Sequence, residues 1–242
     1  MRTAIVADIH GNLTALEAVV ADIERRAPDQ VVHGGDLALA GAQPAEVVDR
    51  VRELDWPGVV GNVDDLLWNP GQLEVQLDRA PKLAQLLHLL FETYAPATRA
   101  LLGEERLAWL RDLPGEHREG DIRVLHASPG DLWRAPMPDA PDDELLETYG
   151  PPNRGIVVYG HIHLPYLRRL ESLTVANTGS VGNPFDGDPR ASYLLVEDGE
   201  PETIRVEYDL EREESIVLDS GYPDAVRIAE MRRRGTFVPV GG

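Results

Sequence analysis

Cysteine is absent from this chain of 242 residues, and so are long apolar runs. Without cysteine there is no disulfide framework and no thiolate for a soft metal ion, although a missing disulfide does not decide between cellular compartments. A helix that crosses a membrane needs about 20 mostly apolar residues, and no stretch of the sequence approaches that length. These absences exclude a membrane-spanning helix and leave oxygen and imidazole groups as the metal-binding chemistry.

Positive charge is also scarce. Lys and Arg together number 23 against 42 Asp and Glu, which gives a formal net charge of -19 at pH 7. Such a surface repels nucleic-acid backbones and anionic membranes at long range. We therefore expect neither a nucleic-acid polymer nor a membrane as partner. The oligomeric state stays open, a homo-oligomer included.

The sequence does contain a series of short motifs built from Asp, Asn and His, most of which follow a run typical of a strand. These motifs are Asp8-Ile9-His10, Gly35-Asp36, Gly61-Asn62, His126 and Gly160-His161-Ile162-His163. The carboxyl ends of strands are where α/β folds place their ligands. Carboxylate, amide and imidazole groups suit Mn, Fe or Zn. The series therefore predicts a metal site in an α/β protein.

Two of these motifs place potential ligands two residues apart. In an extended segment such residues point to the same side, so Asp8 and His10 should converge. The same holds for His161 and His163. A carboxylate at Asp36 could bridge two ions through its two oxygens, and two ions about 3.5–4 Å apart would clamp the oxygens of a phosphoryl transfer. We expect two divalent metal ions, with Mn, Fe or Zn preferred and Mg or Ni as alternatives.

The order D-x-H, G-D, G-N, H and G-H-x-H resembles the calcineurin-like metallophosphoesterase superfamily. Within it, the run from Asn177 to Gly182 and the motif Asp188-Pro189-Arg190 resemble the small bacterial and archaeal phosphoesterases related to YfcE-type phosphodiesterases. The resemblance covers residues 3–196. It implies that one metal ion is bound by Asp8, His10, Asp36 and His163. It implies that the second is bound by Asp36, Asn62, His126 and His161.

We expect Asp36, Asn62 and His126 to take part in catalysis, with Asn62 also stabilising the charge on the phosphoryl oxygens of a bound substrate. Arg134 and Arg190 are candidate phosphate clamps because a guanidinium matches phosphate geometry bidentately. The loop 176–190 that contains Arg190 is either an ordinary strand connection or a segment beside the metal ions. The expected substrate is a small phosphate ester.

One position departs from the family pattern. Many members of the superfamily carry a histidine after the Asn of the third motif, where it assists the leaving group or the phosphate, but this chain has Val63 followed by Asp64. Valine can neither donate a proton nor bind an oxyanion. A positioned acid or base contributes about 10²–10⁴-fold to a rate. Esters whose leaving group needs no protonation should therefore suffer least. Asp64 is a candidate substitute proton donor. His33, at the end of the second strand-like run, is another, although we interpret it as a buried, hydrogen-bonded structural histidine.

The hydrophobic pattern predicts one large α/β domain over residues 1–242. Apolar residues at helical spacing between residues 13 and 23 and a helix opened by Pro44 alternate with three strand-like runs, which favours a parallel sheet. Further runs after residue 122 predict a second, mixed sheet. The expected strands are Thr3–Ala7, Gln30–Val32, Val59–Val60, Arg123–Leu125, Ile156–Tyr159, Tyr166–Leu170, Leu173–Ala176, Ser192–Val196 and Ile204–Tyr208.

These elements predict two facing mixed sheets flanked by helices, a four-layer α-β-β-α sandwich. Residues 64–112 are expected to form a helical insertion that sets access to the site. Residues 210–235 are expected to form a helical C-terminal extension. Its last helix ends at Arg232, Arg233 and Arg234, which we interpret as cations that offset the helix dipole.

The leading hypothesis is a metal-dependent phosphoesterase that hydrolyses phosphodiesters, nucleotide-type esters among them. The alternatives within this chemistry are a phosphomonoesterase and a dinucleoside polyphosphate hydrolase. The alternative of another class is a non-catalytic metal-binding scaffold, which Val63 favours and the complete ligand set opposes. We expect a cytoplasmic protein, because a cleaved signal of about 15–30 residues would remove Asp8 and His10.

Overall fold

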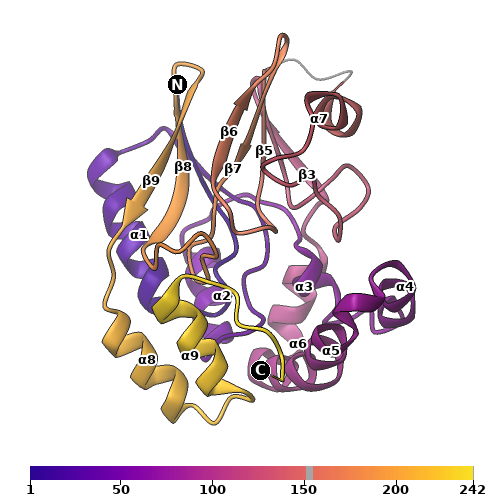
Figure 1. The fold of residues 1–242 in the computed structure, drawn as a ribbon. Helices are drawn as coiled ribbons and strands as arrows, with labels where there is room; N and C mark the ends of the chain where they lie inside the picture. Colours follow the sequence, from indigo (N-terminus) through magenta and orange to yellow (C-terminus); the bar gives the residue numbers. More distant parts are fainter. Residues whose placement is uncertain (151–154, 242) are drawn as a thin grey trace.

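Two β-sheets lie face to face in the computed structural model, which describes residues 1–150 and 155–241 (Figure 1). The first sheet has the strand order β2-β1-β8-β9, in which β1 is parallel to β2 and antiparallel to β8, and β8 is antiparallel to β9. Its strands are β1 (Arg2–Val6), β2 (Gln30–His33), β8 (Ala191–Glu197) and β9 (Glu200–Val206).

The second sheet has the strand order β3-β4-β5-β7-β6. Its three inner strands are parallel, and each edge strand is antiparallel to its neighbour. The strands are β3 (Glu116–Glu119), β4 (Ile122–Leu125), β5 (Gly155–Tyr159), β6 (Tyr166–Arg169) and β7 (Leu173–Asn177).

Aliphatic side chains fill the space between the two sheets, because alternate residues of each strand point to the same face. Ile5 and Leu194 come from the first sheet, and Val124 and Val158 come from the second. All four side chains are fully buried. This layer fixes the two sheets against each other, so the loops at their ends are held in register.

Helices cover the outer faces of both sheets (Figure 1). The helices α1 (Leu13–Arg26), α2 (Pro44–Glu53), α8 (Leu210–Asp219) and α9 (Ala225–Arg234) share one apolar core with the first sheet. Helix α7 (Asp142–Tyr149) packs its buried Leu145 and Tyr149 on the second sheet. The expected fold, two mixed sheets flanked by helices, is confirmed.

The segment expected as a helical insertion is helical over most of its length. It begins inside α3 (Asn62–Asp65) and contains α4 (Gln72–Arg79), a 3₁₀ turn η1 (Pro81–Leu83), α5 (Ala84–His88), a π-helical turn η2 (Leu89–Tyr94) and α6 (Ala95–Arg111). Leu87, Phe91 and Leu110 from these helices are buried in the same core as α1 and α2. The insertion is therefore a packed wall of the molecule.

Three local expectations differ from the structure. Val59–Val60 forms no strand, because this short run lies between Pro57-Gly58 and Gly61, and the isolated bridge beside it joins His33 to Gly58. Strand β3 and helix α7 were not expected, since β3 is an exposed polar edge and α7 is mostly acidic. In the described part of the chain, no helix has both the length and the apolar character that a membrane span requires.

Candidate metal centre

The loops that follow four strands of the two sheets bring the predicted ligands together. Asp8 and His10 follow β1, Asp36 follows β2, His126 follows β4, and His161 and His163 follow β5. Asn62 begins α3. Six of these seven side chains are buried, and His161 is partly buried.

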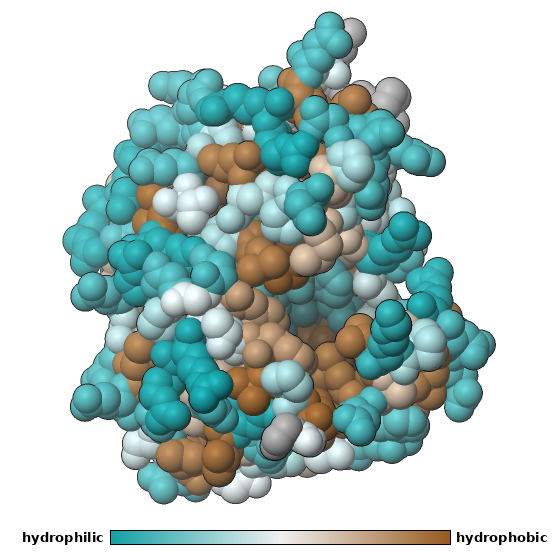
Figure 2. All heavy atoms as spheres, viewed as in Figure 1, coloured by the Kyte–Doolittle hydropathy of each residue, from teal (hydrophilic) through white to brown (hydrophobic). Residues whose placement is uncertain are grey.

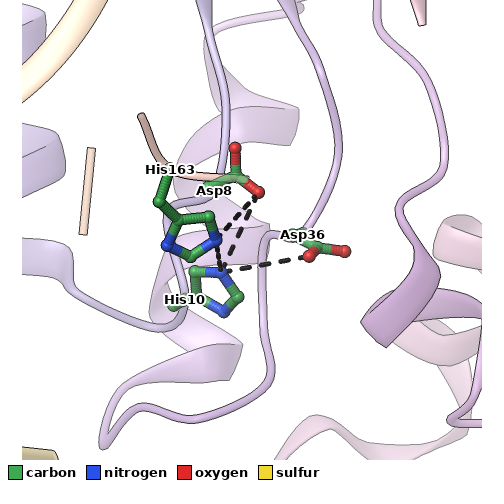
Figure 3. Close-up of side chains that lie close together, drawn as sticks. All are labelled: Asp8, His10, Asp36 and His163. Atoms are coloured by element: carbon green, nitrogen blue, oxygen red, sulfur yellow. Dashed lines mark hydrogen bonds and ion pairs between the residues drawn. The ribbon is translucent and has the colours of Figure 1, made fainter. Parts of the chain in front are cut away.

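The first expected ligand set forms one tight cluster, shown in Figure 3. One ligand atom from each of Asp8, His10, Asp36 and His163 lies within 4.8 Å of the others. His163 Nε2 is 3.3 Å from Asp8 Oδ1 and 3.2 Å from His10 Nε2. Four inward-facing nitrogen and oxygen atoms at this spacing surround a volume suited to a single ion.

The second expected set converges on the side-chain oxygen of Asn62. Asn62 Oδ1 lies 2.7 Å from His126 Nε2 and 2.9 Å from His161 Nδ1. His126 Nε2 is in turn 3.4 Å from Asp36 Oδ2. The structure therefore brings all seven predicted ligands together in two adjoining groups.

Asp36 lies between the two groups, but only one of its oxygens faces both. Asp36 Oδ2 is 3.9 Å from His10 Nε2 and 3.4 Å from His126 Nε2. Asp36 Oδ1 accepts a hydrogen bond of 3.0 Å from the backbone N–H of Val63. Oδ2 is thus the oxygen that faces both groups of ligands, whereas the sequence suggested one oxygen for each group.

The ligands converge through tight turns and not through strand periodicity. Asp8, His10, Asp36, His161 and His163 all have left-handed backbones, with φ of 57°, 51°, 55°, 67° and 58°. Strands β1 and β5 end before these residues. The prediction that each pair lies in an extended segment is therefore wrong. Non-glycine residues with positive φ are uncommon, and such strain is often retained at functional sites.

Two glycines allow these turns to approach one another. A Cβ atom at Gly61 would collide with Asp36 Oδ1, and a Cβ atom at Gly160 would collide with Asp8 Oδ2.

The loop 176–190, which the sequence left open as either a strand connection or a segment beside the metal ions, supports Asp8 directly. Ser180 Oγ donates to the carbonyl of Asp8 at 2.7 Å, and the N–H of Gly182 donates to the same carbonyl at 3.0 Å.

Three histidines are oriented by hydrogen bonds from Nδ1 to backbone carbonyls. The pairs are His10 with Leu39 at 2.8 Å, His126 with Gly34 at 2.8 Å, and His163 with Asn183 at 2.5 Å. A proton held on Nδ1 leaves Nε2 as a lone-pair donor, which is the usual arrangement of a metal-binding imidazole. These carbonyls carry no side-chain signature, so the sequence did not predict them.

Asp64 holds the Gly35-Asp36 and Gly61-Asn62 loops together. Its carboxylate accepts hydrogen bonds from the backbone N–H groups of Asp36 at 2.8 Å, Leu37 at 3.1 Å and Gly61 at 3.2 Å. Burial and the charge of Asp36 raise the pKa of Asp64 to about 7. The sequence suggested Asp64 only as a substitute proton donor, whereas the structure gives it a role in positioning Asp36.

The electrostatics of the cluster fit a bound cation. Burial opposes charge on Asp36, but the charges of His126 and His10 outweigh it and hold the pKa of Asp36 well below its usual range. Burial, followed by repulsion from neighbouring histidines, lowers the pKa values of His10 and His161 to about 4. Within the described residues, Asp8 and Asp36 form ion pairs with histidines and with no Lys or Arg. Two buried carboxylates without a permanent cation suit a metal ion, and the donor set suits Mn, Fe or Zn.

The two predicted phosphate clamps lie outside this constellation. Arg190 is bound by Asp188 on its own loop, with Nη2 2.6 Å from Asp188 Oδ2. Arg134 is exposed and borders other surface depressions. Neither arginine lines the cavity that contains the ligands. The structure therefore gives no geometric support to either clamp.

Two further residues differ from their sequence interpretation. Arg232, read as part of a helix end, is 2 % exposed and donates to the carbonyls of His10 at 2.8 Å and Ala40 at 3.2 Å. His33, expected to be a hydrogen-bonded structural histidine, is fully buried, and neither of its ring nitrogens has a partner among the described residues. No local pattern in the sequence distinguishes Arg232 from its exposed neighbours.

Comparisons with known proteins agree with this geometry. The model of the calcineurin-like phosphoesterase superfamily domain matches residues 1–199. An uncharacterized protein from Methanocaldococcus jannaschii is 30% identical over 244 residues, which cover 91% of this chain and 93% of that protein.

Two solved structures share the fold over nearly the whole chain. A metallophosphoesterase from Sphaerobacter thermophilus has a TM-score of 0.78 and 26% identity, with 98% of this chain and 99% of that chain covered. A hypothetical protein from Pyrococcus horikoshii has a TM-score of 0.79 and 21% identity, with the same coverage of 98% and 99%. These two similarities extend past residue 199, so they include the C-terminal helices.

Proposed function

This chain belongs to the calcineurin-like phosphoesterase superfamily, and from that premise we propose that it hydrolyses phosphodiesters at a centre of two divalent metal ions. It is an enzyme acting on phosphoric ester bonds, with a buried Asp and His cluster for metal binding. The observation that carries the dinuclear proposal is the position of Asp36 Oδ2, which lies between the two groups of ligands.

Each proposed ion has four protein ligands. The first would be held by Asp8, His10, Asp36 and His163, and the second by Asp36, Asn62, His126 and His161. Mn, Fe or Zn fits this mixture of imidazole and oxygen donors, and Mg or Ni is the alternative. When bound, the ions would supply Lewis-acid charge for the phosphoryl oxygens and would activate water.

The protein residues then set which esters react. Asn62 Oδ1 faces two histidines, so its Nδ2 group is the donor left for a phosphoryl oxygen. Val63 lies where a proton donor would assist the leaving group, and it cannot transfer a proton. The leaving alcohol must therefore depart without help from this position, which favours aryl esters and other alcohols of low pKa.

The cavity at the ligands favours a diester over a monoester. Among the described residues that line it, Arg227 is the only Arg or Lys, and its guanidinium is already bound by other groups. A monoester carries up to two negative charges and a diester only one, so the diester has less need of a further cation. A non-catalytic scaffold is not retained, because the chain is an enzyme of this superfamily and keeps every predicted ligand.

Steady-state kinetics test this proposal. We expect kcat/KM for bis(4-nitrophenyl) phosphate to exceed that for 4-nitrophenyl phosphate, with Mn, Fe, Zn, Mg and Ni each supplied in turn to metal-free protein. Asp36→Asn should abolish both activities, whereas Asp188→Asn, on the exposed loop, should keep them. A preference for the monoester, or for diadenosine polyphosphates, would replace the proposed substrate class.

A further inference from the structure

A cavity of about 240 Å³ opens directly from the ligand cluster. Its lining includes His10, Asp36, Asn62, His161 and His163, so any group in the cavity lies beside the proposed ions. Away from these ligands the lining is mostly apolar, and Figure 2 shows a hollow bordered by hydrophobic residues next to the insertion helices.

The insertion supplies one apolar wall of this cavity. Leu83, Leu86, Leu87 and Leu90 line it from η1, α5 and η2. Leu87 is 4 % exposed and belongs to the core, whereas Leu83 is 50 % exposed at the rim. The wall is therefore anchored on its inner side and open to a ligand at its edge.

Aromatic residues supply another part of the lining, starting at a proposed metal ligand. The ring of Phe185 stacks on the ring of His163, with centroids 4.4 Å apart and an interplanar angle of 17°. Phe237 meets Phe185 edge to face at 5.7 Å and is 42 % exposed. Val63 extends the apolar surface to the second ligand group. The apolar lining is thus continuous from the ligands to the rim.

Arg227, the cationic side chain in the lining, is not free to bind a second anionic group. Arg227 donates through Nε to Asp224 at 2.5 Å, through Nη1 to the carbonyl of Val238 at 2.9 Å and through Nη2 to Tyr94 Oη at 2.7 Å. Its charge is neutralised by Asp224. Among the described residues away from the metal ligands, a second phosphate or carboxylate in this cavity would have no free cationic partner.

We infer that this cavity binds an uncharged, apolar organic group of the ester, an aryl ring or a short alkyl chain, while the phosphate lies at the metal ligands. The inference rests on the proposed function and narrows its substrate class. A cavity of about 150 Å³ lined by aliphatic and aromatic residues holds benzene, so about 240 Å³ has room for a substituted ring or a chain of several carbons. A nucleotide with further phosphates does not fit this lining.

Binding of phosphonates tests the cavity without turnover, because a phosphonate carries a single organic group and is not hydrolysed. We expect the Kd for the Mn-loaded protein, measured by calorimetry, to fall from methylphosphonate to butylphosphonate by at least tenfold. Complete burial gives about fourfold for each methylene, and partial burial gives less. 3-Carboxypropylphosphonate has the same chain length with a charged end, and it should bind no more tightly than methylphosphonate.

Rim variants assign the effect to this cavity. Leu83→Ser and Phe237→Ser change half-exposed side chains, so folding should persist. Each variant should reduce the ratio of the Kd for methylphosphonate to the Kd for butylphosphonate at least threefold. Leu101→Ser changes a leucine of α6 that is 49 % exposed and does not line the cavity, and it should leave the ratio unchanged.

Two results would overturn the inference. One is equal Kd values for methylphosphonate and butylphosphonate in the wild-type protein. The other is an unchanged ratio in both rim variants. Neither result depends on turnover, so an inactive protein that still binds butylphosphonate more tightly would contradict the proposed reaction and leave the cavity assignment standing.

Discussion

Val63 connects the chemistry of the centre to the shape of the cavity beside it. Its backbone N–H binds Asp36 Oδ1 at 3.0 Å, and its side chain is 6 % exposed and lines the cavity. One residue therefore fixes the orientation of the Asp36 carboxylate while presenting methyl groups where the superfamily often has an imidazole. The backbone role survives any substitution except proline, so the side chain can be changed separately.

We predict that Val63→His flattens the dependence of turnover on the pKa of the leaving group. The wild-type kcat/KM should fall steeply from aryl to alkyl esters, because the alcohol departs unprotonated. An imidazole should raise kcat/KM for poor leaving groups by up to about 10²-fold, the lower end for a positioned acid, with little effect on aryl esters. Val63→Leu, which is apolar, serves as the control. Ready cleavage of alkyl esters by the wild-type enzyme would mean that another residue, such as Asp64, supplies the proton.

His33 is a second residue whose environment departs from its sequence interpretation. Burial, assisted by the nearby His117, lowers its pKa to about 3 from the ordinary value of 6.5. The unfolded chain therefore takes up a proton on this residue near pH 6.5, whereas the folded protein does not until about pH 3. The contribution of His33 to stability is complete above pH 6.5 and is lost as the pH falls toward 3.

We predict that His33→Leu makes the protein less sensitive to acid. In the wild type this residue should cost up to about 1.4 kcal/mol of unfolding free energy for each pH unit below about 6. Leucine removes that cost and also removes two ring nitrogens without partners. Urea unfolding at pH 8, 7, 6 and 5 measures the difference between the two proteins. The prediction is wrong if this difference does not grow as the pH falls.

At the scale of elements, apolar patterning predicts most strands, together with the helices α1 and α2 of the first sheet. Strand β4, for example, is the expected run extended by one residue, Ile122. The failures have physical causes. Strand β3 has no apolar face to signal it, and the left-handed turns at Asp8 and His10 arise from hydrogen bonds to the loop after β2, as in His10 N–H to the carbonyl of Asp36 at 3.0 Å. The sequence around Asp8 and His10 carries no signal of these hydrogen-bond partners, because they lie far away in the chain.

Helix α9 shows the same limit, because its tertiary role depends on partners far away in the sequence. Arg233 and Arg234 are exposed and paired at the surface, as expected for a helix end. Arg232, between Met231 and Arg233, instead forms a buried ion pair with Glu213 of α8 and reaches the loop of His10. The family model ends at residue 199, yet the C-terminal extension supports the loop that carries His10 through Arg232.

We predict that Arg232 contributes to metal affinity separately from its contribution to stability. Arg232→Met alone leaves Glu213 buried and unpaired, which should cost about 3–5 kcal/mol. The double variant Arg232→Met/Glu213→Leu should recover most of that loss. Its Kd for Mn should still rise about 10–100-fold, as for other outer partners of metal ligands, because the carbonyls of His10 and Ala40 have lost their donors.

Urea unfolding and Mn titration separate these two effects. Arg233→Met, which removes an exposed arginine of the same helix, is the matched control and should change neither quantity appreciably. If the double variant binds Mn as tightly as the wild type, Arg232 serves the core alone.

At the scale of the whole molecule, the centre joins the two sheets. Asp8, His10 and Asp36 follow strands of the first sheet, and His126 and His163 follow strands of the second. An ion bound by both groups therefore links the two halves of the sandwich, and the unfolded chain has no such site. Binding energy at the centre consequently adds to the stability of the entire fold.

We predict that the dependence of stability on metal concentration counts the bound ions. At free Mn concentrations above both dissociation constants, each tenfold increase adds about 1.4 kcal/mol to the unfolding free energy for every ion released on unfolding. Two ions should give about 2.7 kcal/mol per tenfold. Urea unfolding, followed by tryptophan fluorescence in buffered Mn, measures this slope.

Asp36→Asn weakens both sites at once and should lower the slope to the value for one ion or fewer over the same concentrations. Asp188→Asn removes a carboxylate bound to Arg190 on the surface loop and should keep the full slope. A wild-type slope of about 1.4 kcal/mol would mean a single structural ion, and the dinuclear centre would have to be abandoned.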